Sequence, residues 1–178
     1  MTEGPEPIPR EQLLSTVGEF FKRCSTMSLA TVDPEGRPHA ANLYFAADQA
    51  VNLHFVSDPA SAHCRDLEAR PDVAATVYEP VASWRDIRGV QLRGLAAPIG
   101  DDEWDAVWRL YVDRFPDVEA MEPIVRRQRF YRVVPTWLRW IDNTVGFGFK
   151  RELAFEGRGR GREGGDRTAN DARGVGDG

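Results

Sequence analysis

The sequence has few cysteines and no long apolar run. Only two cysteines occur among 178 residues, Cys24 and Cys64, and they lie far apart, outside any metal-binding or redox spacing. This pattern is typical of a reducing compartment, where both side chains stay as thiols. No apolar stretch reaches the roughly 18 residues that span a bilayer, and the N-terminus, MTEGPEPIPREQ, is acidic and proline-rich, unlike a secretory signal. We therefore expect a soluble, cytoplasmic protein without a membrane segment.

The motifs of several enzyme classes are also missing. The three histidines, His39, His54 and His63, have no spacing typical of a zinc site, and no clustered carboxylates complete one. The chain lacks the G-x-S-x-G elbow of hydrolases, the P-loop and the G-x-G-x-x-G dinucleotide fingerprint. Its net charge of −5 at pH 7 argues against a general nucleic-acid binder. We expect no bound metal, and no motif assigns a catalytic residue.

What the sequence does contain is a series of short strand patterns. With 42% hydrophobic residues, the chain can bury one sizeable core. Helices are predicted over 10–23, 61–70 and 101–115, with a looser helical segment over 117–128. Strands are predicted in 26–48, around a hairpin turn at Pro34-Glu35-Gly36, and over 49–57, 72–80, 87–100, 129–134, 136–143 and 150–155. Short strands with tight turns predict a mainly β fold with peripheral helices, arranged as a small barrel.

The composition divides the chain into one domain with two polar ends. Residues 1–10 read as a flexible arm and residues 11–156 as the globular domain. Residues 157–178 hold eight of the sixteen glycines, mixed charges and almost nothing to bury, so we predict that this tail is disordered. Its arginine–glycine run resembles a short RNA-binding tract, but acidic residues dilute it. A tether or solubilising tail is the better interpretation.

Hydroxyls and an imidazole gather where the third strand ends and a helix begins. Ser57 ends the strand, Ser61 stands at the N-cap position of the helix, and His63 lies in its first turn. Free backbone N–H groups and the positive end of the helix dipole meet at such a place, and phosphate binds there readily. The competing interpretation is that Ser61 caps the helix and His63 is a surface residue. Asp58 would repel an anion unless it points away.

Three further segments combine polar and aromatic residues. Alternation along the second strand places Asn42 and Tyr44 on one face and Leu43 on the other, so the polar face either borders a planar ligand or is half solvated. Gln91 either hydrogen-bonds a heterocycle edge or faces water. Near the C-terminus, "WLRWIDNTVGFGFK" contains Trp140, Asn143 and Lys150. Lys150 offers a cation for a phosphate or a carboxylate. The alternative is a strand, a turn with Asx hydrogen bonds and another strand.

Taken together, these segments resemble a known family. The runs "MSLATVDPEGRPHAANLYF", "FVSDPASAHCRDLEARPDVAATV" and "IRGVQLRG" are similar to the pyridoxamine 5′-phosphate oxidase-like, FMN-binding split-barrel superfamily. "YVDRFP" and "IDNTVGFGFK" look like its YhbP-like branch. The resemblance covers roughly residues 12–153. It implies a six-stranded split β-barrel and a homodimer with FMN at the subunit interface.

The resemblance also implies roles for particular residues. In relatives, the region that matches Ser57, Ser61 and His63 contacts the FMN phosphate. The second strand runs along the isoalloxazine ring, which points to Asn42, Leu43 and Tyr44, and the fifth strand brings a polar side chain, here Gln91, to the flavin. The C-terminal block of the second subunit completes the pocket, which makes Trp140, Asn143 and Lys150 cofactor-binding candidates.

The sequence also departs from pyridoxamine phosphate oxidases. Those enzymes carry a lysine where His63 stands and an arginine near Asn42, and their C-terminal Arg-x-His substrate motif is missing here. We therefore do not expect vitamin B6 oxidation. The first hypothesis is an FMN-dependent oxidoreductase that transfers hydride or electrons to or from a small-molecule substrate. The alternative is a non-catalytic carrier or sensor that holds haem, FMN or another flavin on the same fold.

Overall fold

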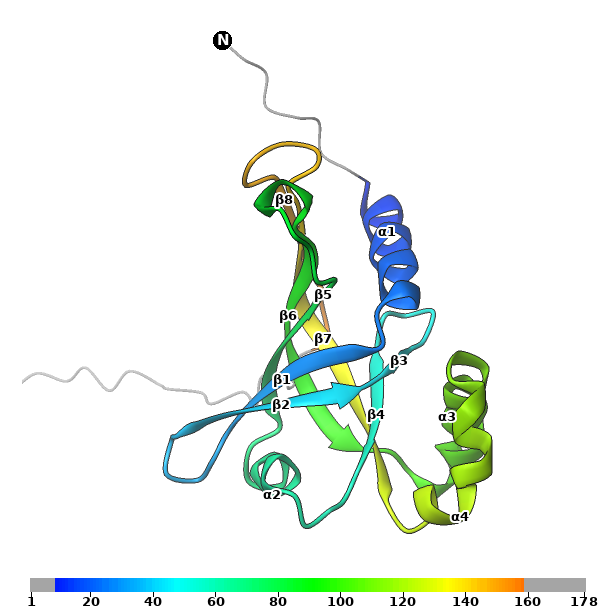
Figure 1. Cartoon of the computed structure of the whole chain (residues 1–178). Coiled ribbons are helices and arrows are strands. Elements are labelled where there is room, and N and C mark those ends of the chain that lie inside the picture. The colour runs from blue at the N-terminus through cyan, green and yellow to red at the C-terminus, as the bar shows by residue number, and fades with distance from the viewer. Residues whose placement is uncertain (1–8, 159–178) are drawn as a thin grey trace, which may run out of the picture.

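One antiparallel sheet organises the chain in the computed structural model, which describes residues 9–158 (Figure 1). Most of the predicted arm and tail, residues 1–8 and 159–178, lies outside the described residues. The strands are β1 (Thr26–Val32), β2 (Pro38–Tyr44), β3 (Ala46–Ala47), β4 (Leu53–Ser57), β5 (Asp72–Tyr78), β6 (Arg88–Pro98), β7 (Arg129–Asp142) and β8 (Lys150–Ala154). The helices are α1 (Arg10–Arg23), α2 (Ala62–Ala69), α3 (Trp104–Arg114) and α4 (Glu122–Val125), with the 3-10 turns η1 (Trp84–Asp86), η2 (Asp101–Glu103) and η3 (Pro116–Met121).

The sheet curls into a half-barrel. Neighbouring strands follow the order β2-β1-β5-β6-β7-β4-β3, and β8 pairs with the second half of β7. Figure 1 shows α1 and α3 along one side of the sheet and α2 at the end opposite to β8. The predicted mainly β split barrel with peripheral helices is confirmed. The two-residue β3 pairs with β4, and β8 pairs with β7.

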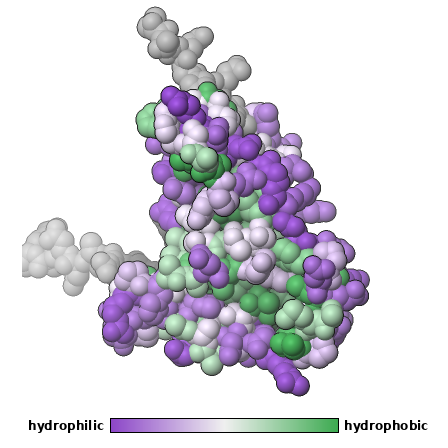
Figure 2. Space-filling model, viewed as in Figure 1, coloured by the Kyte–Doolittle hydropathy of each residue, from purple (hydrophilic) through white to green (hydrophobic). Residues whose placement is uncertain are grey.

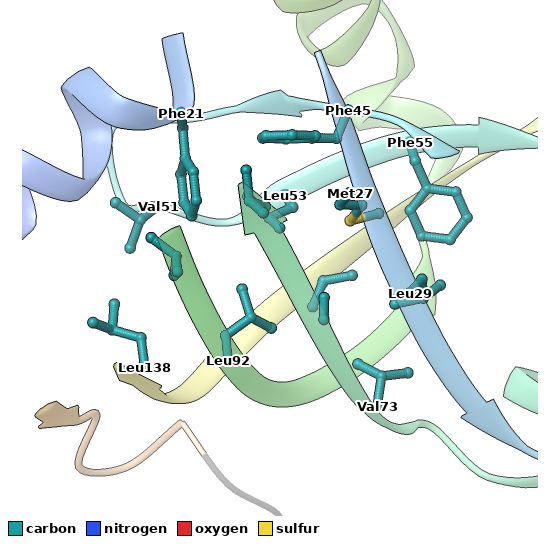
Figure 3. Close-up of a cluster of buried hydrophobic side chains, with 14 of the residues drawn as sticks. Phe21, Met27, Leu29, Phe45, Val51, Leu53, Phe55, Val73, Leu92 and Leu138 are labelled. Carbon is teal, nitrogen blue, oxygen red and sulfur yellow. The ribbon is translucent and has the colours of Figure 1, made fainter. Parts of the chain in front are cut away.

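The core lies between the concave face of the sheet and α1. Helical spacing places Leu13, Val17, Phe20 and Phe21 of α1 on one buried face, as the sequence predicts. Figure 3 shows Phe21 and Phe45 beside aliphatic side chains from several strands. Because each fully buried side chain of this size contributes roughly 1.5–3 kcal/mol, this cluster holds the helix on the sheet.

The C-terminal strand differs from the prediction of two strands over 129–134 and 136–143. β7 is one strand of 14 residues that continues through Pro135. Proline has no N–H to donate to a ladder and is tolerated in a sheet at a bulge. The register of β6 with β7 shifts between Arg93 and Gly94, and Pro135 stands opposite Gly94. The irregular pairing therefore accommodates the proline without ending the strand.

The third predicted strand, 49–57, begins later than expected. The Asp48 carboxylate accepts hydrogen bonds from the backbone N–H groups of Ala50 and Asn52, both at 2.9 Å. Val51 has a positive φ of 57° inside this turn. β4 therefore starts only at Leu53. Across residues 9–158, no helix is long and apolar enough to cross a membrane.

Candidate ligand-binding site

The structure brings Ser57, Ser61 and His63 together. His63 Nε2 lies 2.8 Å from Ser57 Oγ and 3.1 Å from Ser61 Oγ, and the two hydroxyls are 3.4 Å apart. We call these three residues the serine–histidine cluster. The three side chains are partly exposed and lie at the end of β4 and the start of α2. The cluster therefore presents convergent polar atoms beside a helix N-terminus.

Simple capping does not account for Ser61. It occupies the N-cap position of α2, but its side chain makes no capping hydrogen bond and turns to His63 instead. The preceding loop is closed by Asp58, whose carboxylate accepts from the backbone N–H of Ala60 at 2.8 Å. The Arg65 guanidinium donates to the carbonyl oxygen of Ala60, which brings a permanent cation to the same loop. The sequence analysis did not name Arg65 as a site residue, although the predicted helix over 61–70 already placed it near the helix N-terminus.

Burial keeps the His63 ring neutral. Burial lowers the pKa of His63 below its ordinary value, and the negative charge of Asp66 opposes this shift only in part. At neutral pH the ring therefore offers one N–H and one lone pair to the serine hydroxyls. The cluster can donate hydrogen bonds to an anion, while the positive charge comes from Arg65 and the helix dipole.

A second histidine, His39 of β2, which sequence reasoning did not place in the site, contacts α2 through Asp66. His39 Nδ1 is 2.7 Å from Asp66 Oδ2, and the same oxygen accepts a hydrogen bond from Thr31 Oγ1 at 2.7 Å. Burial raises the pKa of Asp66, but the hydrogen bonds from Thr31 and His39 outweigh it and hold the pKa below its ordinary value. His39 and Asp66 are 27 residues apart, so no local pattern shows this pairing.

The outward face of the sheet carries a polar row that crosses six strands. The directly paired residues, in strand order, are Asn42, Ser28, Thr76, Gln91, Arg139 and Glu152. Directly opposite residues of an antiparallel pair share one face. Ser28 Oγ donates to Asn42 Oδ1 at 2.7 Å, and Arg139 donates to Gln91 Oε1 at 3.3 Å and to Glu152 Oε1 at 2.9 Å. Asn42 and Gln91 thus belong to one continuous polar strip, which we call the polar row.

A groove runs beside the polar row. It has a volume of about 730 Å³, and its lining includes the small residues Ala30, Ala74 and Ala154. The guanidinium of Arg93 lies over the Trp137 ring at 4.7 Å in the same groove. Small side chains and a stacked aromatic give this part of the outward face room for a flat ligand.

The other predicted ring contacts divide between the two faces of the sheet. Tyr44 is 61% exposed, as expected for the outward face. Leu43 packs against the core from the other side of β2, and Trp140 is buried against Phe20, with ring centroids 5.0 Å apart. Lys150 is exposed at the start of β8.

Asn143 holds the turn between β7 and β8. Its side chain donates to the carbonyl oxygen of Trp84 at 2.7 Å and accepts from the backbone N–H of Gly148 at 3.2 Å. Asp142 Oδ1 also accepts from the backbone N–H of Thr144 at 3.0 Å. The interpretation of this segment as a strand, an Asx-bonded turn and a strand is therefore confirmed.

This turn belongs to an exposed apolar surface at the β8 end. Six of the nine exposed large hydrophobic residues in the described part of the chain come from two neighbouring connections, 78–87 and 143–149. Figure 2 shows hydrophobic atoms at this end of the molecule. We call these six residues the aromatic tip: Tyr78, Val81, Trp84, Ile87, Val145 and Phe147. Exposed apolar clusters of this kind are rare on monomeric domains and often belong to interaction surfaces.

Known proteins resemble this chain in sequence and in fold. The family model described as pyridoxamine 5′-phosphate oxidase matches residues 13–141. The UPF0306 protein YhbP of Salmonella schwarzengrund is 32% identical over 138 residues, covering 77% of this chain and 90% of that protein. HutZ, the haem storage protein from Vibrio cholerae, is 23% identical with a TM-score of 0.59, covering 68% of this chain and 88% of that one. A haem-binding protein from Mycobacterium smegmatis is 17% identical with a TM-score of 0.66, covering 85% and 64%.

Proposed function

Because the chain belongs to the pyridoxamine 5′-phosphate oxidase family, we propose that it binds FMN and acts as an FMN-dependent oxidoreductase on a small-molecule substrate. The observation that carries this proposal is the serine–histidine cluster at the start of α2. Two hydroxyls and an imidazole converge there, Ser61 is free from capping, and Arg65 supplies positive charge to the same loop. A phosphate dianion needs these hydrogen-bond donors and this charge.

The polar row and its groove fit the ring of such a cofactor. FMN, when bound, supplies hydride and electron transfer, and the protein contributes binding and orientation. Arg139 can only donate hydrogen bonds, so it fixes the oxygen of Gln91 and leaves the Gln91 amide N–H groups to donate outward. Such donors match the carbonyl oxygens of an isoalloxazine ring. Glu152 balances the charge of Arg139.

The placement of these two regions favours a homodimer with the cofactor at the subunit interface. The serine–histidine cluster lies at the α2 end of the chain, whereas Asn42, Gln91 and the groove lie on the outward face of the sheet. A second copy can bring its outward face to the cluster of the first. The aromatic tip supplies apolar surface for such an association, and Asn143 and Lys150 lie next to it.

The alternative function is a non-catalytic carrier or sensor that holds haem or another flavin. Two of the structural neighbours are described as a haem storage protein and a haem-binding protein. The observation in this chain that favours the alternative is the exposed His39, whose ring is held by a buried carboxylate on α2. A protein of this kind would bind its ligand without turning over a reduced nicotinamide.

The test of FMN binding is an absorbance spectrum of the purified protein after incubation with FMN and desalting. We expect retained flavin bands in the wild type and loss of most of the flavin from Ser61→Ala and His63→Gln. Ser15→Ala, which removes an exposed hydroxyl from α1, is the matched control and should retain flavin. Turnover of a reduced nicotinamide by the loaded protein then separates an oxidoreductase from a carrier. Absence of flavin from the wild type, or full retention in both cluster variants, contradicts the proposal.

A further inference from the structure

A second row of directly paired residues runs beside the polar row on the outward face of the sheet. It lies two residues away along each strand, which is the next side-chain position on the same face and a separation of roughly 7 Å. In strand order the residues are Ala40, Ala30, Ala74, Arg93, Trp137 and Ala154. Because the first side chains of this row are single methyl groups, they leave a low floor that ends at Arg93 and Trp137.

Arg93 supplies a positive charge at the end of this floor, and the Trp137 ring holds it in place. The Arg93 guanidinium lies 4.7 Å from the centre of the ring, and the Arg139 guanidinium packs over the same ring at 5.1 Å. Arg139 is paired with Glu152 at 2.8 Å, whereas within residues 9–158 the Arg93 guanidinium forms no ion pair and no hydrogen bond. A guanidinium that is stacked on a ring keeps the N–H groups along its edge for an anion.

The charges that line the groove favour a ligand with a single negative charge. Asp72 also lines the groove, two residues before Ala74, which is paired with Arg93. One positive and one negative side chain leave no excess positive charge for a dianion such as phosphate. A carboxylate carries one charge, and its two oxygens match two parallel N–H groups of a guanidinium.

The size of the groove fits a small flat molecule. Its volume of about 730 Å³ lies within the range of sites that enclose small molecules, roughly 300–1,000 Å³. The lining extends from Pro38 of β2 to Ala154 of β8, and six neighbouring strands about 4.8 Å apart span roughly 24 Å. A flat ligand can therefore lie on the alanines with its carboxylate at Arg93, beside a cofactor ring on the polar row.

We propose that Arg93 binds the carboxylate of the substrate and that Trp137 is the positioning residue for its guanidinium. This inference rests on the proposed function, because it assigns the substrate of that site to the class of flat monocarboxylates. Binding forms no covalent bond and moves no proton, since a carboxylate and a guanidinium are both ionised at neutral pH.

The test is isothermal titration calorimetry of the full-length protein with benzoate and trans-cinnamate, and with benzamide and cinnamamide as neutral probes of similar shape. We expect the wild type to bind the carboxylates, and Arg93→Gln to bind them about tenfold more weakly or worse, because a charge-assisted pair is lost. The amides should bind more weakly than the carboxylates and equally to both proteins. Arg109→Gln, which removes an exposed arginine from α3, is the matched control and should bind the carboxylates as the wild type does.

The positioning role of Trp137 has a separate readout, the ratio of carboxylate affinity to amide affinity. Trp137→Leu should lower this ratio, because the guanidinium then loses the ring that holds it, and Trp137→Phe should restore it. Ala74→Leu, at an exposed position on the floor of the groove, should weaken the binding of carboxylates and amides alike. Circular dichroism checks that each variant is folded.

The proposal is overturned if the wild type binds neither carboxylate, if it binds each carboxylate no better than its amide, or if Arg93→Gln keeps the wild-type affinity. Flavin retention, measured by absorbance in the same samples, tests the proposed function separately. Carboxylate binding that depends on Arg93 in a protein without flavin would support the carboxylate site and contradict the oxidoreductase. Retained flavin together with unchanged carboxylate binding by Arg93→Gln would do the reverse.

Discussion

The pairing of Gly94 with β7 leads to a stability prediction of known sign. A Cβ added at Gly94 would lie 2.4 Å from the carbonyl oxygen of Val134, 3.0 Å from its carbonyl carbon and 3.1 Å from Pro135 Cα. All three atoms belong to the backbone, so no side chain can rotate away. The strand itself must move, at the point where the register between β6 and β7 shifts. Gly18, in the middle of α1, has no atom within 4 Å of the same added group.

Alanine at these two positions should therefore change stability in opposite directions. Crowding of a packed interior destabilises by about 1–3 kcal/mol and occasionally more, so Gly94→Ala should lower the free energy of unfolding by at least this amount. Gly18→Ala should raise it by roughly 0.5–1 kcal/mol, because glycine is a poor helix residue. For a chain of this size each kcal/mol shifts Tm by roughly 2–4 °C. We expect Gly94→Ala to melt about 2–12 °C below the wild type and Gly18→Ala about 1–4 °C above it.

Thermal and urea unfolding followed by circular dichroism measure both variants under one set of conditions. Gly146→Ala, at an exposed loop glycine with nothing within 4 Å, shows the effect of the substitution alone. A Gly94→Ala protein as stable as the wild type would refute the argument, since the added methyl group would then have found room beside Val134 without displacing the strand.

Two further predictions concern pH and association. The pKa of His63 is lowered by burial, so the unfolded chain takes up a proton near pH 6.5 before the folded chain does. The free energy of unfolding, measured by urea denaturation, should fall as pH drops below about 6.5. In His63→Gln, the free energy of unfolding should depend less on pH in that window. If it depends on pH equally in both proteins, His63 does not titrate in this way. Trp84→Ser combined with Phe147→Ser should shift the sedimentation coefficient from that of two chains to that of one, without changing the circular dichroism spectrum. Unchanged sedimentation would remove the aromatic tip from the proposed dimer interface.

The helices and most strands were predictable because their signals are local. The apolar face of α1 and the turn at Pro34-Glu35-Gly36 follow from spacing and turn chemistry within a few residues. The serine–histidine cluster was predictable for the same reason, since Ser57 and His63 are only six residues apart. Interactions that depend on strand register could not be predicted from the sequence. Asn42 and Gln91 belong to one polar row only because three strand pairings align.

The position of Trp140 shows how one irregular residue changes a whole segment. In the first half of β7, Tyr131, Val133 and Pro135 are buried at odd positions, whereas Phe130, on the other face, is buried against Tyr111 of α3. After Pro135 the buried residues are Leu138 and Trp140, at even positions, because the register shift opposite Gly94 reverses the alternation. The reversal turns Trp140 toward Phe20 and Arg139 toward the outward face, where it fixes Gln91. If the alternation continued unbroken through Pro135, Arg139 would face the core and Trp140 would face outward. The same glycine that the stability prediction tests therefore also decides which side chains of β7 reach the proposed ligand, so a Gly94→Ala protein that folds with a shifted strand should lose FMN as well.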